Sequence, residues 1–306
     1  MDPIESIKPY KDTSFALMLA AQALGHEIVY LPKNGLALME GVATGMMQTV
    51  TVTDGVNTGF ASLSEQTRAP LSDLDVIMIR VDPPFDNEYL YGTHILERAK
   101  QHGIRVVNNP QAIRDCNEKL FATEFSALMP TTWVSSRHED IRAFQQSHGD
   151  IILKPLDGMG GSGIFRITAD GLNLGAVLET LSPDESRLVM AQEYRPEIAD
   201  GDRRVLVLHG QPISHVLARI PSQGETRGNL AAGGRGVAMP ISDREREIAE
   251  TVGPYLLERG LLFVGLDVIG GHLTEINVTS PTCVREIDAQ ANTQIGHDFF
   301  EALFNQ

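Results

Sequence analysis

The chain has 306 residues, of which 42% are hydrophobic and 21% are charged. At about 150 residues per domain this length predicts two domains, with one large domain as the alternative. The composition excludes a disordered or collagen-like chain. The longest apolar runs, such as Leu261–Val264 and Val76–Ile79, are far short of the roughly 20 residues that span a bilayer. The first residues carry no apolar segment with a basic flank, so we expect no secretory signal there.

The charge balance is strongly acidic, with 25 basic and 40 acidic residues and a formal net charge of −15. Such a chain repels a nucleic-acid backbone, so we expect no nucleic-acid partner. A local arginine cluster can still bind a small anion, because screening acts over about 8 Å at physiological salt. Cys116 and Cys283 are far apart in sequence, which favours neither a disulfide framework nor a zinc motif and predicts a reducing, cytoplasmic location.

The first third of the chain alternates helical and extended segments, which predicts an α/β domain with a parallel sheet. The expected elements are a helix at 12–25, a strand at 27–31, irregular strands or a hairpin at 41–60, a strand at 75–79, a helix at 87–102 and a strand at 104–107. The chain begins with the loop Met1-Asp2-Pro3, which a preceding strand would normally deliver. We therefore expect that the first strand of this sheet is missing.

From about residue 118 the pattern changes to strands with inserted helices, which predicts an α+β domain with mixed sheets. The expected elements are a helix at 117–128, strands at 150–155, 163–168, 191–194, 203–208 and 216–220, a helix at 244–259, two further strands, and a C-terminal helix from about 289. The sequence shows neither an internal repeat nor a low-complexity linker.

A glycine-rich loop at 158–163, with the sequence GMGGSG, matches the G-x-G-x-x-G pattern of dinucleotide-binding proteins. That motif must open a helix, whereas the residues after Gly163 alternate in the manner of a strand, so we expect the loop to join two strands of a hairpin. Closely spaced backbone N–H groups in such a loop suit phosphate oxygens, and Lys154 lies on the entering strand. The alternative is a flexible turn beside a surface lysine.

Two acidic residues face each other on a late predicted hairpin. A three-residue loop after Ile269 would pair that residue with Leu273 and would place Asp267 directly opposite Glu275. Asn277 shares a face with Glu275 because side chains alternate along a strand. Like charges in this position are destabilising unless they are neutralised, and oxygen ligands of this kind suit Mg²⁺. The alternative is a polar outer face with solvated acids.

Arginines gather in one part of this acidic chain. They are Arg203, Arg204, Arg219, Arg227 and Arg235. Their guanidinium forks match the geometry of carboxylates and phosphates. The segment 222–236 is rich in glycine, includes Ala231 and Ala232, and has too little apolar area to order by itself, so we expect a mobile lid that closes over a substrate. The alternative is a disordered surface loop. Arg80, at the end of a predicted strand, could meet an anion at the sheet edge or form a surface salt bridge.

These segments belong to longer blocks that follow one another along the whole chain. The blocks are MDPI, KDTSFA, IRVDPPFD, VNNPQAIRDCNEKLFATEF, IILKPLDGMGGSGIFR, LARIPSQGETRGNLAAGGRG and FVGLDVIGGHLTEINVTSPTCVREI. Together they closely resemble the bacterial type of glutathione synthetase, an ATP-grasp ligase family. The resemblance implies a substrate-side domain at 1–117 and an ATP-grasp domain at 118–306, with a small subdomain at 118–190 and a catalytic, metal-binding subdomain at 191–306. The family usually carries a short strand before MDPI, which this sequence lacks.

The resemblance also implies a reaction: γ-glutamylcysteine is joined to glycine with ATP and Mg²⁺ or Mn²⁺, in a homotetramer. ATP would lie between two sheet-based subdomains. The positions that match ATP-binding residues of the family are Lys119, Lys154, Gly158, Gly160, Gly161, Ser162, Gly163, Gln192, Glu193 and Tyr194. Those that match its metal ligands are Asp267, Glu275 and Asn277. Those that match residues near the reacting groups or the peptide substrate are Ser14, Arg80, Arg204, Arg219 and Arg227.

The chemistry of such a ligase agrees with these residue types. A carboxylate is a poor acylating agent, so it first takes the γ-phosphate of ATP, and the amine of glycine then attacks the resulting acyl phosphate. Arg204 is the candidate donor to the tetrahedral oxyanion, and the lid would exclude water. Cys283 is expected to be a small buried residue and not a nucleophile. The alternatives are another ATP-grasp carboxylate–amine ligase, a non-catalytic ATP-binding regulator, and an NAD oxidoreductase, which the strand after Gly163 disfavours.

Overall fold

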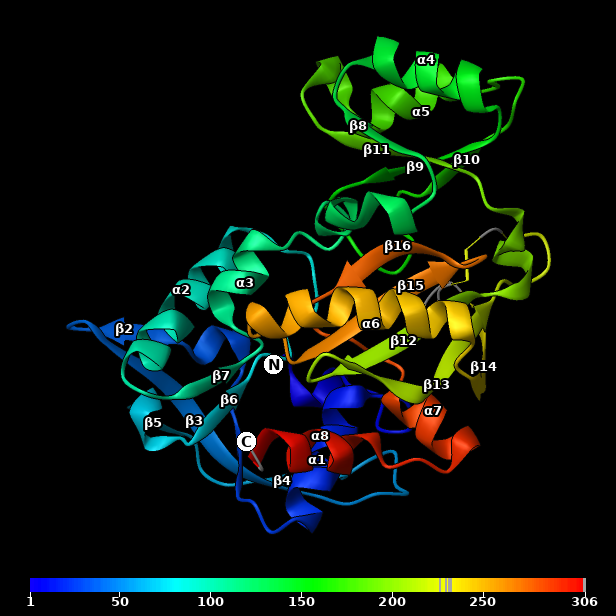
Figure 1. The fold of residues 1–306 in the computed structure, drawn as a ribbon. Coiled ribbons are helices and arrows are strands. Elements are labelled where there is room, and N and C mark those ends of the chain that lie inside the picture. Colours follow the sequence, from blue (N-terminus) through cyan, green and yellow to red (C-terminus); the bar gives the residue numbers. More distant parts are fainter. Residues whose placement is uncertain (226, 229, 231–232, 305–306) are drawn as a thin grey trace.

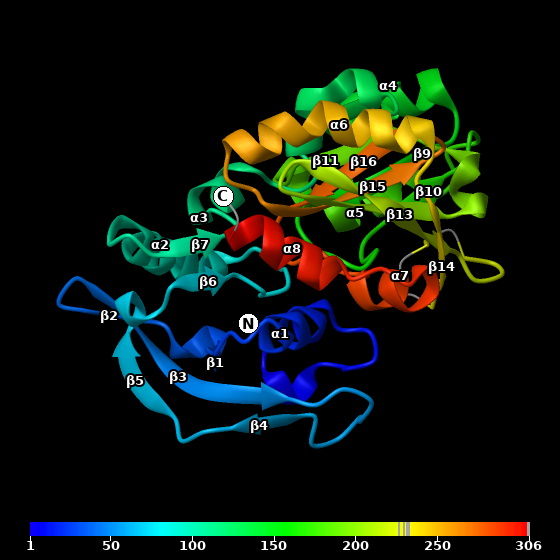
Figure 2. The same cartoon turned by 60° about the horizontal axis from the view of Figure 1, so that its bottom comes forward.

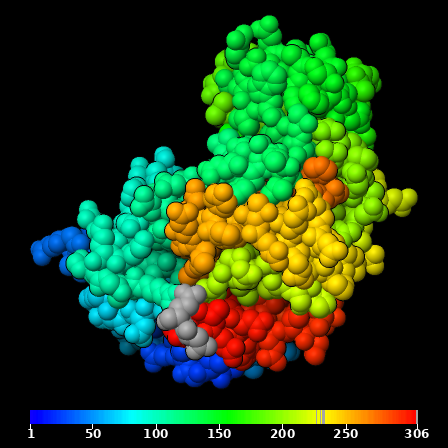
Figure 3. All heavy atoms as spheres, in the orientation of Figure 1, coloured from blue at the N-terminus to red at the C-terminus, as the bar shows by residue number. Residues whose placement is uncertain are grey.

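A computed structural model describes residues 1–225, 227–228, 230 and 233–304. Figure 1 shows three parts: an N-terminal domain and a central sheet, which together form a body, and a smaller lobe that stands on the body. The space-filling view in Figure 3 shows the same lobe projecting from the rest of the molecule. Ala231 and Ala232 of the predicted lid lie outside the described residues. No helix in the described part of the chain is long and apolar enough to cross a membrane.

The N-terminal domain contains two separate sheets. The larger has only antiparallel pairs and consists of β1 (Ile28–Tyr30), β2 (Ala37–Met39), β3 (Val42–Val52), β4 (Ala61–Leu63) and β5 (Thr67–Pro70). The smaller pairs β6 (Val76–Met78) with β7 (Arg105–Val107) in parallel. The predicted parallel sheet is therefore wrong for most of this domain. Within the predicted range 41–60, residues 42–52 form the long strand β3, whose loops to β2 and β4 are too short for the crossover that a parallel pair requires.

Helices cover both faces of this domain. The predicted helix at 12–25 is confirmed as α1 (Thr13–Ala23), which begins where the Asp12 carboxylate accepts a hydrogen bond from the Phe15 N–H at 2.8 Å. The helix α2 (Asn87–Gln101) crosses back between β6 and β7, and α3 (Pro110–Asp115) follows β7. Figure 2 shows α1 beside the last helix, α8 (Ile295–Phe304). Short 3₁₀-helices are η1 (Ile4–Ser6), η2 (Lys33–Gly35) and η3 (Leu71–Asp73).

The smaller lobe is a four-stranded antiparallel sheet in the order β10-β9-β11-β8. Its elements are β8 (Thr132–Ser135), α4 (His138–His148), β9 (Ile151–Pro155), β10 (Phe165–Ile167), α5 (Leu174–Leu181), η5 (Pro183–Glu185) and β11 (Val189–Glu193). The predicted hairpin around the glycine-rich loop is confirmed, because β9 and β10 pair antiparallel. The helix predicted at 117–128 is confirmed in part: the 3₁₀-helix η4 (Phe121–Leu128) covers residues 121–128 and is kinked at Phe125.

The central sheet has five strands in the order β14-β13-β12-β15-β16. They are β12 (Asp202–Leu208), β13 (Gln211–Ile220), β14 (Arg235–Pro240), β15 (Phe263–Ile269) and β16 (His272–Asn277), and η6 (Pro196–Asp200) precedes them. The helix α6 (Asp243–Glu258) packs on this sheet. The C-terminal helix predicted from about 289 is confirmed as α8 but begins later, because Asn292 adopts a left-handed conformation that separates α8 from α7 (Val284–Ala291). The end of the predicted lid belongs to β14, since Arg235 pairs with Ile220.

The hairpin of β15 and β16 has a shorter loop than predicted, but Asp267 and Glu275 are paired as predicted. The turn has two residues, Gly270 and Gly271, and Ile269 pairs with His272. Both glycines have positive φ (57° and 73°), which such a tight turn requires. A bulge at 274 adds one residue to β16 and restores the register, so Asp267 still lies opposite Glu275.

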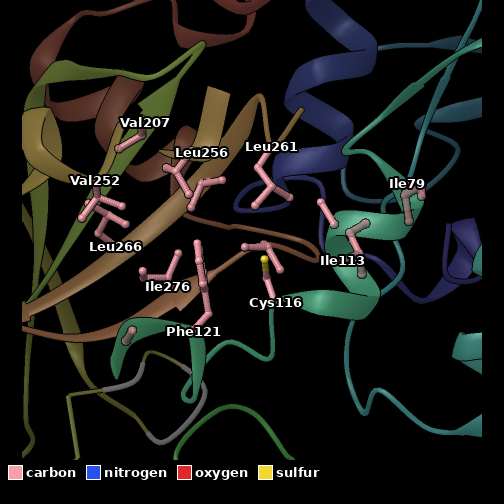
Figure 4. Packing of buried hydrophobic residues seen from close by; sticks show 14 of the residues in the cluster. Ile79, Ile113, Cys116, Phe121, Val207, Val252, Leu256, Leu261, Leu266 and Ile276 are labelled. Carbon is pink, nitrogen blue, oxygen red and sulfur yellow. The ribbon is translucent and has the colours of Figure 1, made fainter. Parts of the chain in front are cut away.

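A continuous hydrophobic core joins the N-terminal domain to the central sheet. Figure 4 shows Ile113 and Cys116, which follow β7, pointing toward Leu261, Leu266 and the other side chains of the central layer. The buried amide of Asn108 reinforces this junction by four hydrogen bonds with the backbone of Leu262, Phe263 and Val278, at 2.7 to 3.0 Å. The two parts of the body are therefore held in a fixed relation, and the functional cavity lies beside their junction.

Candidate active site

A cavity of about 470 Å³ lies where the three parts of the molecule meet. All but one of the residues predicted for the site line it. They are Ser14, Arg80, Lys119, Lys154, Gly158, Gly160, Gly161, Ser162, Gln192, Glu193, Tyr194, Arg204, Arg219, Arg227, Asp267, Glu275 and Asn277. Gly163 instead packs on the entering strand, where a Cβ would stand 3.2 Å from Pro155. The fold thus gathers these residues at one place, while the individual roles stay predictions.

Two lysines converge on the cavity from different parts of the fold. The Lys154 ammonium on β9 donates to the Gln192 side chain at 3.1 Å and to the Thr274 carbonyl at 3.3 Å, and it is buried. The Lys119 ammonium lies 3.2 Å from the Glu275 carboxylate and donates to the Gly158 carbonyl at 3.2 Å. Burial lowers the pKa of Lys154. The alternative of a surface lysine at position 154 is therefore wrong.

The glycine-rich loop forms a rim of the cavity. Gly158, Gly160, Gly161 and Gly163 all have positive φ, between 66° and 89°, a conformation that costs other residues free energy. The glycines are thus needed for the path of the backbone between β9 and β10. The guanidinium of Arg227 approaches the Gly161 carbonyl at 3.5 Å, so the predicted lid and the loop meet over the cavity.

The segment predicted to line the adenine lies on the lobe side of the cavity. Gln192 is buried and donates to the Thr132 hydroxyl at 2.9 Å. The ring of Tyr194 lies under the Arg166 guanidinium, 3.9 Å from its carbon atom to the ring centroid. These contacts hold the end of β11 against the lobe and leave its backbone at the cavity wall.

Four buried charges of alternating sign cross the floor of the cavity. The Arg204 Nε lies 2.6 Å from Asp267, Arg219 bridges Asp267 at 2.9 Å and Asp202 at 2.5 Å, and all four side chains are buried. Burial alone would raise the pKa of Asp267, but the two guanidiniums hold it well below its usual range. Burial raises the pKa of Asp202 to about 6 although Arg219 opposes the shift. The β-sheet register explains this row of alternating charges, because Arg204 pairs with Asp267 and Asp202 with Arg219 on neighbouring strands.

Oxygen donors suitable for a divalent ion lie at the same place. Asn277 donates its side-chain amide N–H to the Gly265 carbonyl at 3.1 Å, which leaves its side-chain oxygen as an acceptor, and Asp267 and Glu275 line the same cavity. Among the described residues, no group of three or more His, Cys, Asp and Glu side chains could hold a metal. Two carboxylates and one amide oxygen nevertheless fit Mg²⁺, which is usually held by few protein ligands together with substrate phosphates.

Arg80 and Ser14 form the end of the cavity that faces the N-terminal domain. Arg80 is buried, and its Nε donates to the Ser14 hydroxyl at 3.0 Å while one Nη donates to the Pro281 carbonyl at 3.0 Å. Its other Nη has no partner in the described part of the chain. A surface salt bridge is therefore the wrong interpretation of Arg80. A buried guanidinium with an unused donor is suited to bind a carboxylate.

Two of the clustered arginines do not join the site. Arg203 instead lies 3.3 Å from Glu245 of α6, and Arg235 is exposed at the start of β14. Cys283 is buried at the start of α7, as expected, and burial raises the pKa of its thiol. A high thiol pKa disfavours the nucleophilic thiolate.

The sequence did not single out Glu118 or Asp202. The half-buried Glu118 carboxylate accepts hydrogen bonds from the N–H groups of Val278 and Thr279 and from the Thr279 hydroxyl, at 2.8 to 3.0 Å. It thereby fixes the segment that directly follows Asn277. The one signal in the sequence is that Glu118 precedes Lys119, whereas Asp202 could have been found only from its register opposite Arg219.

Comparison with known families identifies the fold and the class. Residues 1–114 match the N-terminal domain of prokaryotic glutathione synthetase, and residues 118–292 match its ATP-grasp domain. The chain belongs to the prokaryotic glutathione synthetase family. The glutathione synthetase of Pseudomonas aeruginosa is 55% identical over 306 residues, which is 100% of this chain and 96% of the relative. That of Vibrio cholerae is 53% identical over 303 residues, covering 99% of this chain and 95% of the relative.

Solved structures share the fold of this glutathione synthetase family member at lower identity. The ATP-grasp ligase PsnB, complexed with minimal precursor, Mg and ADP, aligns with a TM-score of 0.60 at 21% identity over 95% of this chain and 92% of that chain. A RimK domain ATP-grasp protein from Sphaerobacter thermophilus aligns with a TM-score of 0.57 at 16% identity, over 94% and 93% of the two chains. The chain is an ATP-grasp ligase with glutathione synthetase activity.

Proposed function

We propose that the chain joins γ-glutamylcysteine to glycine through an acyl phosphate and releases ADP and phosphate. The observation that carries this proposal is a single cavity lined by two lysines, a glycine-rich loop and two buried arginines that pair with acids. This set suits phosphoryl transfer, in which catalysis consists largely of positioning and charge stabilisation.

The nucleotide would lie between the lobe and the central sheet. Lys119 and Lys154 bind the terminal phosphates, the backbone N–H groups of the glycine-rich loop cover them, and the segment 192–194 lines the adenine. Asp267, Glu275 and Asn277 hold Mg²⁺, which supplies charge neutralisation at the phosphates. The complex of the related ligase PsnB with Mg and ADP supports this choice of ion.

The remaining arginines bind the dipeptide, stabilise the reacting groups and close the cavity. Arg80, oriented by Ser14, binds a carboxylate of the dipeptide with its unused Nη donor. Arg204 and Arg219 lie beside the reacting groups, and Arg204 donates to the tetrahedral oxyanion. Arg227, in the segment 222–236, closes the cavity and keeps water from the acyl phosphate.

Product analysis tests the reaction. With ATP, Mg²⁺, γ-glutamylcysteine and glycine, ADP, phosphate and a new amide should form in equal amounts. AMP and pyrophosphate would contradict the proposal, because they indicate adenylation of the acid. A panel of other acids and amines distinguishes a glutathione synthetase from another carboxylate–amine ligase on the same fold.

The metal site is tested separately. Glu275→Gln and Asn277→Ala should raise the Mg²⁺ concentration needed for turnover while the thermal unfolding temperature stays close to that of the parent, since apolar neighbours such as Leu266 and Ile276 do the packing. Unchanged activity at limiting Mg²⁺ would show that this face is merely solvated.

We also propose a domain at 1–117, subdomains at 118–190 and 191–306, a homotetramer, and a cytoplasmic location. The two family matches, which change over between residues 114 and 118, support the first boundary. Light scattering of the purified protein tests the oligomer, and limited proteolysis tests the boundaries.

A further inference from the structure

The active-site cavity contains a carboxylate that the proposed mechanism has not used. Glu286 lies in the first turn of α7 and lines the cavity. Its Oε2 atom is buried and accepts no hydrogen bond from the described part of the chain. A buried acceptor without a partner costs free energy, and most such atoms in proteins are paired. Glu286 is therefore suited to accept a hydrogen bond from a bound substrate.

A donor without a partner lines the same cavity. One Nη of Arg80 is buried and unpaired among the described residues, while the rest of this guanidinium bonds to Ser14 and to the Pro281 carbonyl, each at 3.0 Å. The cavity thus offers both a free carboxylate oxygen, on Glu286, and a free guanidinium N–H. This combination is complementary to a zwitterion, whose ammonium needs an acceptor and whose carboxylate needs a donor.

The start of α1 brings these two groups to one place. The Thr13 hydroxyl accepts a hydrogen bond from the Val284 N–H at 3.2 Å, which holds the first turn of α7 against α1, two residues before Glu286. The next residue, Ser14, accepts the bond from Arg80. In Figure 1 both helices lie below the strands of the central sheet. Because neighbouring Cα atoms are about 3.8 Å apart, α7 and Arg80 contact the same turn of α1.

The proposed acid substrate has a zwitterionic end of this kind. γ-Glutamylcysteine carries two carboxylates, and the one on cysteine takes the phosphoryl group, so it lies toward Arg204 and the metal ligands. The other carboxylate shares its carbon atom with the ammonium group of the γ-glutamyl residue. The γ linkage leaves both of these groups free, so one carbon atom presents a negative and a positive charge together.

We propose that Glu286 binds the ammonium group of the γ-glutamyl residue while Arg80 binds the carboxylate on the same carbon atom. This assignment, which rests on the proposed function, makes Glu286 a specificity-determining residue that selects acids with a free ammonium at this position. An analogue that lacks the ammonium would leave the Glu286 carboxylate buried without a partner, and sites of this type reject such analogues.

The charges around Glu286 agree with this role. Burial raises the pKa of its carboxyl group, whereas Lys11 and Arg204 favour the ionised form and Asp12 opposes it. A bound ammonium would add a further positive charge beside the carboxylate. Asp12 also lines the cavity, but its carboxylate already caps α1 by accepting from the Phe15 N–H at 2.8 Å. Asp12 is therefore the alternative ammonium ligand that an experiment must separate from Glu286.

Binding of γ-glutamylcysteine and of N-glutarylcysteine, which keeps both carboxylates and lacks only the ammonium, tests the proposal. Isothermal titration calorimetry of the full chain with ADP and Mg²⁺ gives both dissociation constants. The parent should bind γ-glutamylcysteine about 10- to 100-fold more tightly, as expected for one bond between charged groups. Glu286→Gln should lose most of this preference by weakening γ-glutamylcysteine alone. Its unfolding temperature should not fall, because Oε2 has no described partner to lose.

Asp12→Asn is the matched control, because asparagine also caps a helix, and it should keep the preference of the parent. The proposal is overturned if Glu286→Gln keeps the preference or if Asp12→Asn loses it instead. A parent that forms glutathione without preferring γ-glutamylcysteine over N-glutarylcysteine contradicts only the assignment of Glu286. A parent that binds neither compound and forms no amide contradicts both this assignment and the proposed function.

Discussion

The central sheet and the N-terminal domain differ in how completely their strands are paired. In the central sheet, each of the five strands pairs with the strand next to it in the sequence, and the four buried charges on β12, β13 and β15 pair with charges of opposite sign. In the N-terminal domain the strands form two sheets, β1–β5 and the pair of β6 and β7, which share no ladder among the described residues, and burial of the Met1 amine lowers its pKa to about 6.

This difference shows which strands are aligned by nearby residues and which depend on distant parts of the chain. Two pairs of the central sheet, β12 with β13 and β15 with β16, are joined by two-residue turns, which bring these strands together locally. In the N-terminal domain, β1 and β6 both line a second cavity, of about 1020 Å³. The active site lies between the two regions and takes its ion pairs from the first and its Arg80–Ser14 pair from the second. The following substitutions and conditions test this contrast.

The largest effect is expected from Asp267→Asn, which breaks the alternating charges of the central sheet. It would leave two buried guanidiniums poorly compensated, and removal of one partner of a buried pair costs about 3–5 kcal/mol. The free energy of unfolding, measured by denaturant titration, should fall by this amount. The matched control is Asp150→Asn, which breaks an exposed pair with Arg166 at 2.5 Å and should cost less than about 1 kcal/mol. Equal losses in both variants would mean that the buried network does not stabilise the sheet.

The buried Met1 amine predicts a pH dependence for the N-terminal domain. Its pKa is about 6 in the folded chain because of burial, compared with 8.0 as an ordinary value, and Asp2, Arg80 and Lys33 are the charged groups around it. Between pH 6 and 8 the unfolded chain binds more protons, so stability should rise with pH by about 2–3 kcal/mol. Denaturant titrations across this range measure the slope.

Acetylation of the Met1 amine is the control for this pH dependence. The acetylated chain keeps every histidine and loses only the titrating amine, so its slope between pH 6 and 8 should be smaller. Identical slopes for the free and acetylated chains would show that the amine does not titrate in this range.

Glu118→Leu should weaken the metal site without touching a predicted ligand. It removes the acceptor for three hydrogen bonds that hold residues 278–279. Loss of groups that orient metal ligands typically costs about 10–100-fold in affinity. Binding of Mn²⁺ in the presence of ADP, followed by its electron paramagnetic resonance signal, reports this without turnover. Glu118→Gln keeps an acceptor oxygen and should stay within a few-fold of the parent. If both variants bind Mn²⁺ equally, Glu118 has no positioning role.

The smallest effect is expected from Arg227→Ala. This residue approaches the Gly161 carbonyl at 3.5 Å and pairs with Glu225 at 2.5 Å. Its loss should open the cavity to water, so a few-fold larger share of ATP hydrolysis proceeds without amide formation. The ratio of phosphate to glutathione measures the uncoupling. Arg235→Ala, on the exposed start of β14, is the control. Full coupling in Arg227→Ala would remove this residue from the closure of the site.

Local patterns in the sequence determined much of the chemistry. The apolar periodicity of residues 12–25 predicted α1, and the strand-like alternation after Gly163 predicted that the glycine-rich loop joins two strands. The pairing of Asp267 with Glu275 was also correct, although for a reason that the sequence did not reveal. A bulge at 274 compensated for a shorter turn, and bulges depend on the neighbouring strands and not on the turn residues alone.

Contacts between distant segments could be decided only by tertiary structure. The direction of the N-terminal strands was wrong because alternation of helix and strand does not reveal which strands pair. Asp202 became a site residue through its register with Arg219, and Glu118 through bonds to residues about 160 positions away. Arg80 was ambiguous in sequence and became a buried donor only where the N-terminal domain meets the central sheet. Local sequence sets periodicity, caps and turns, whereas burial and charge pairing depend on what the whole chain brings together.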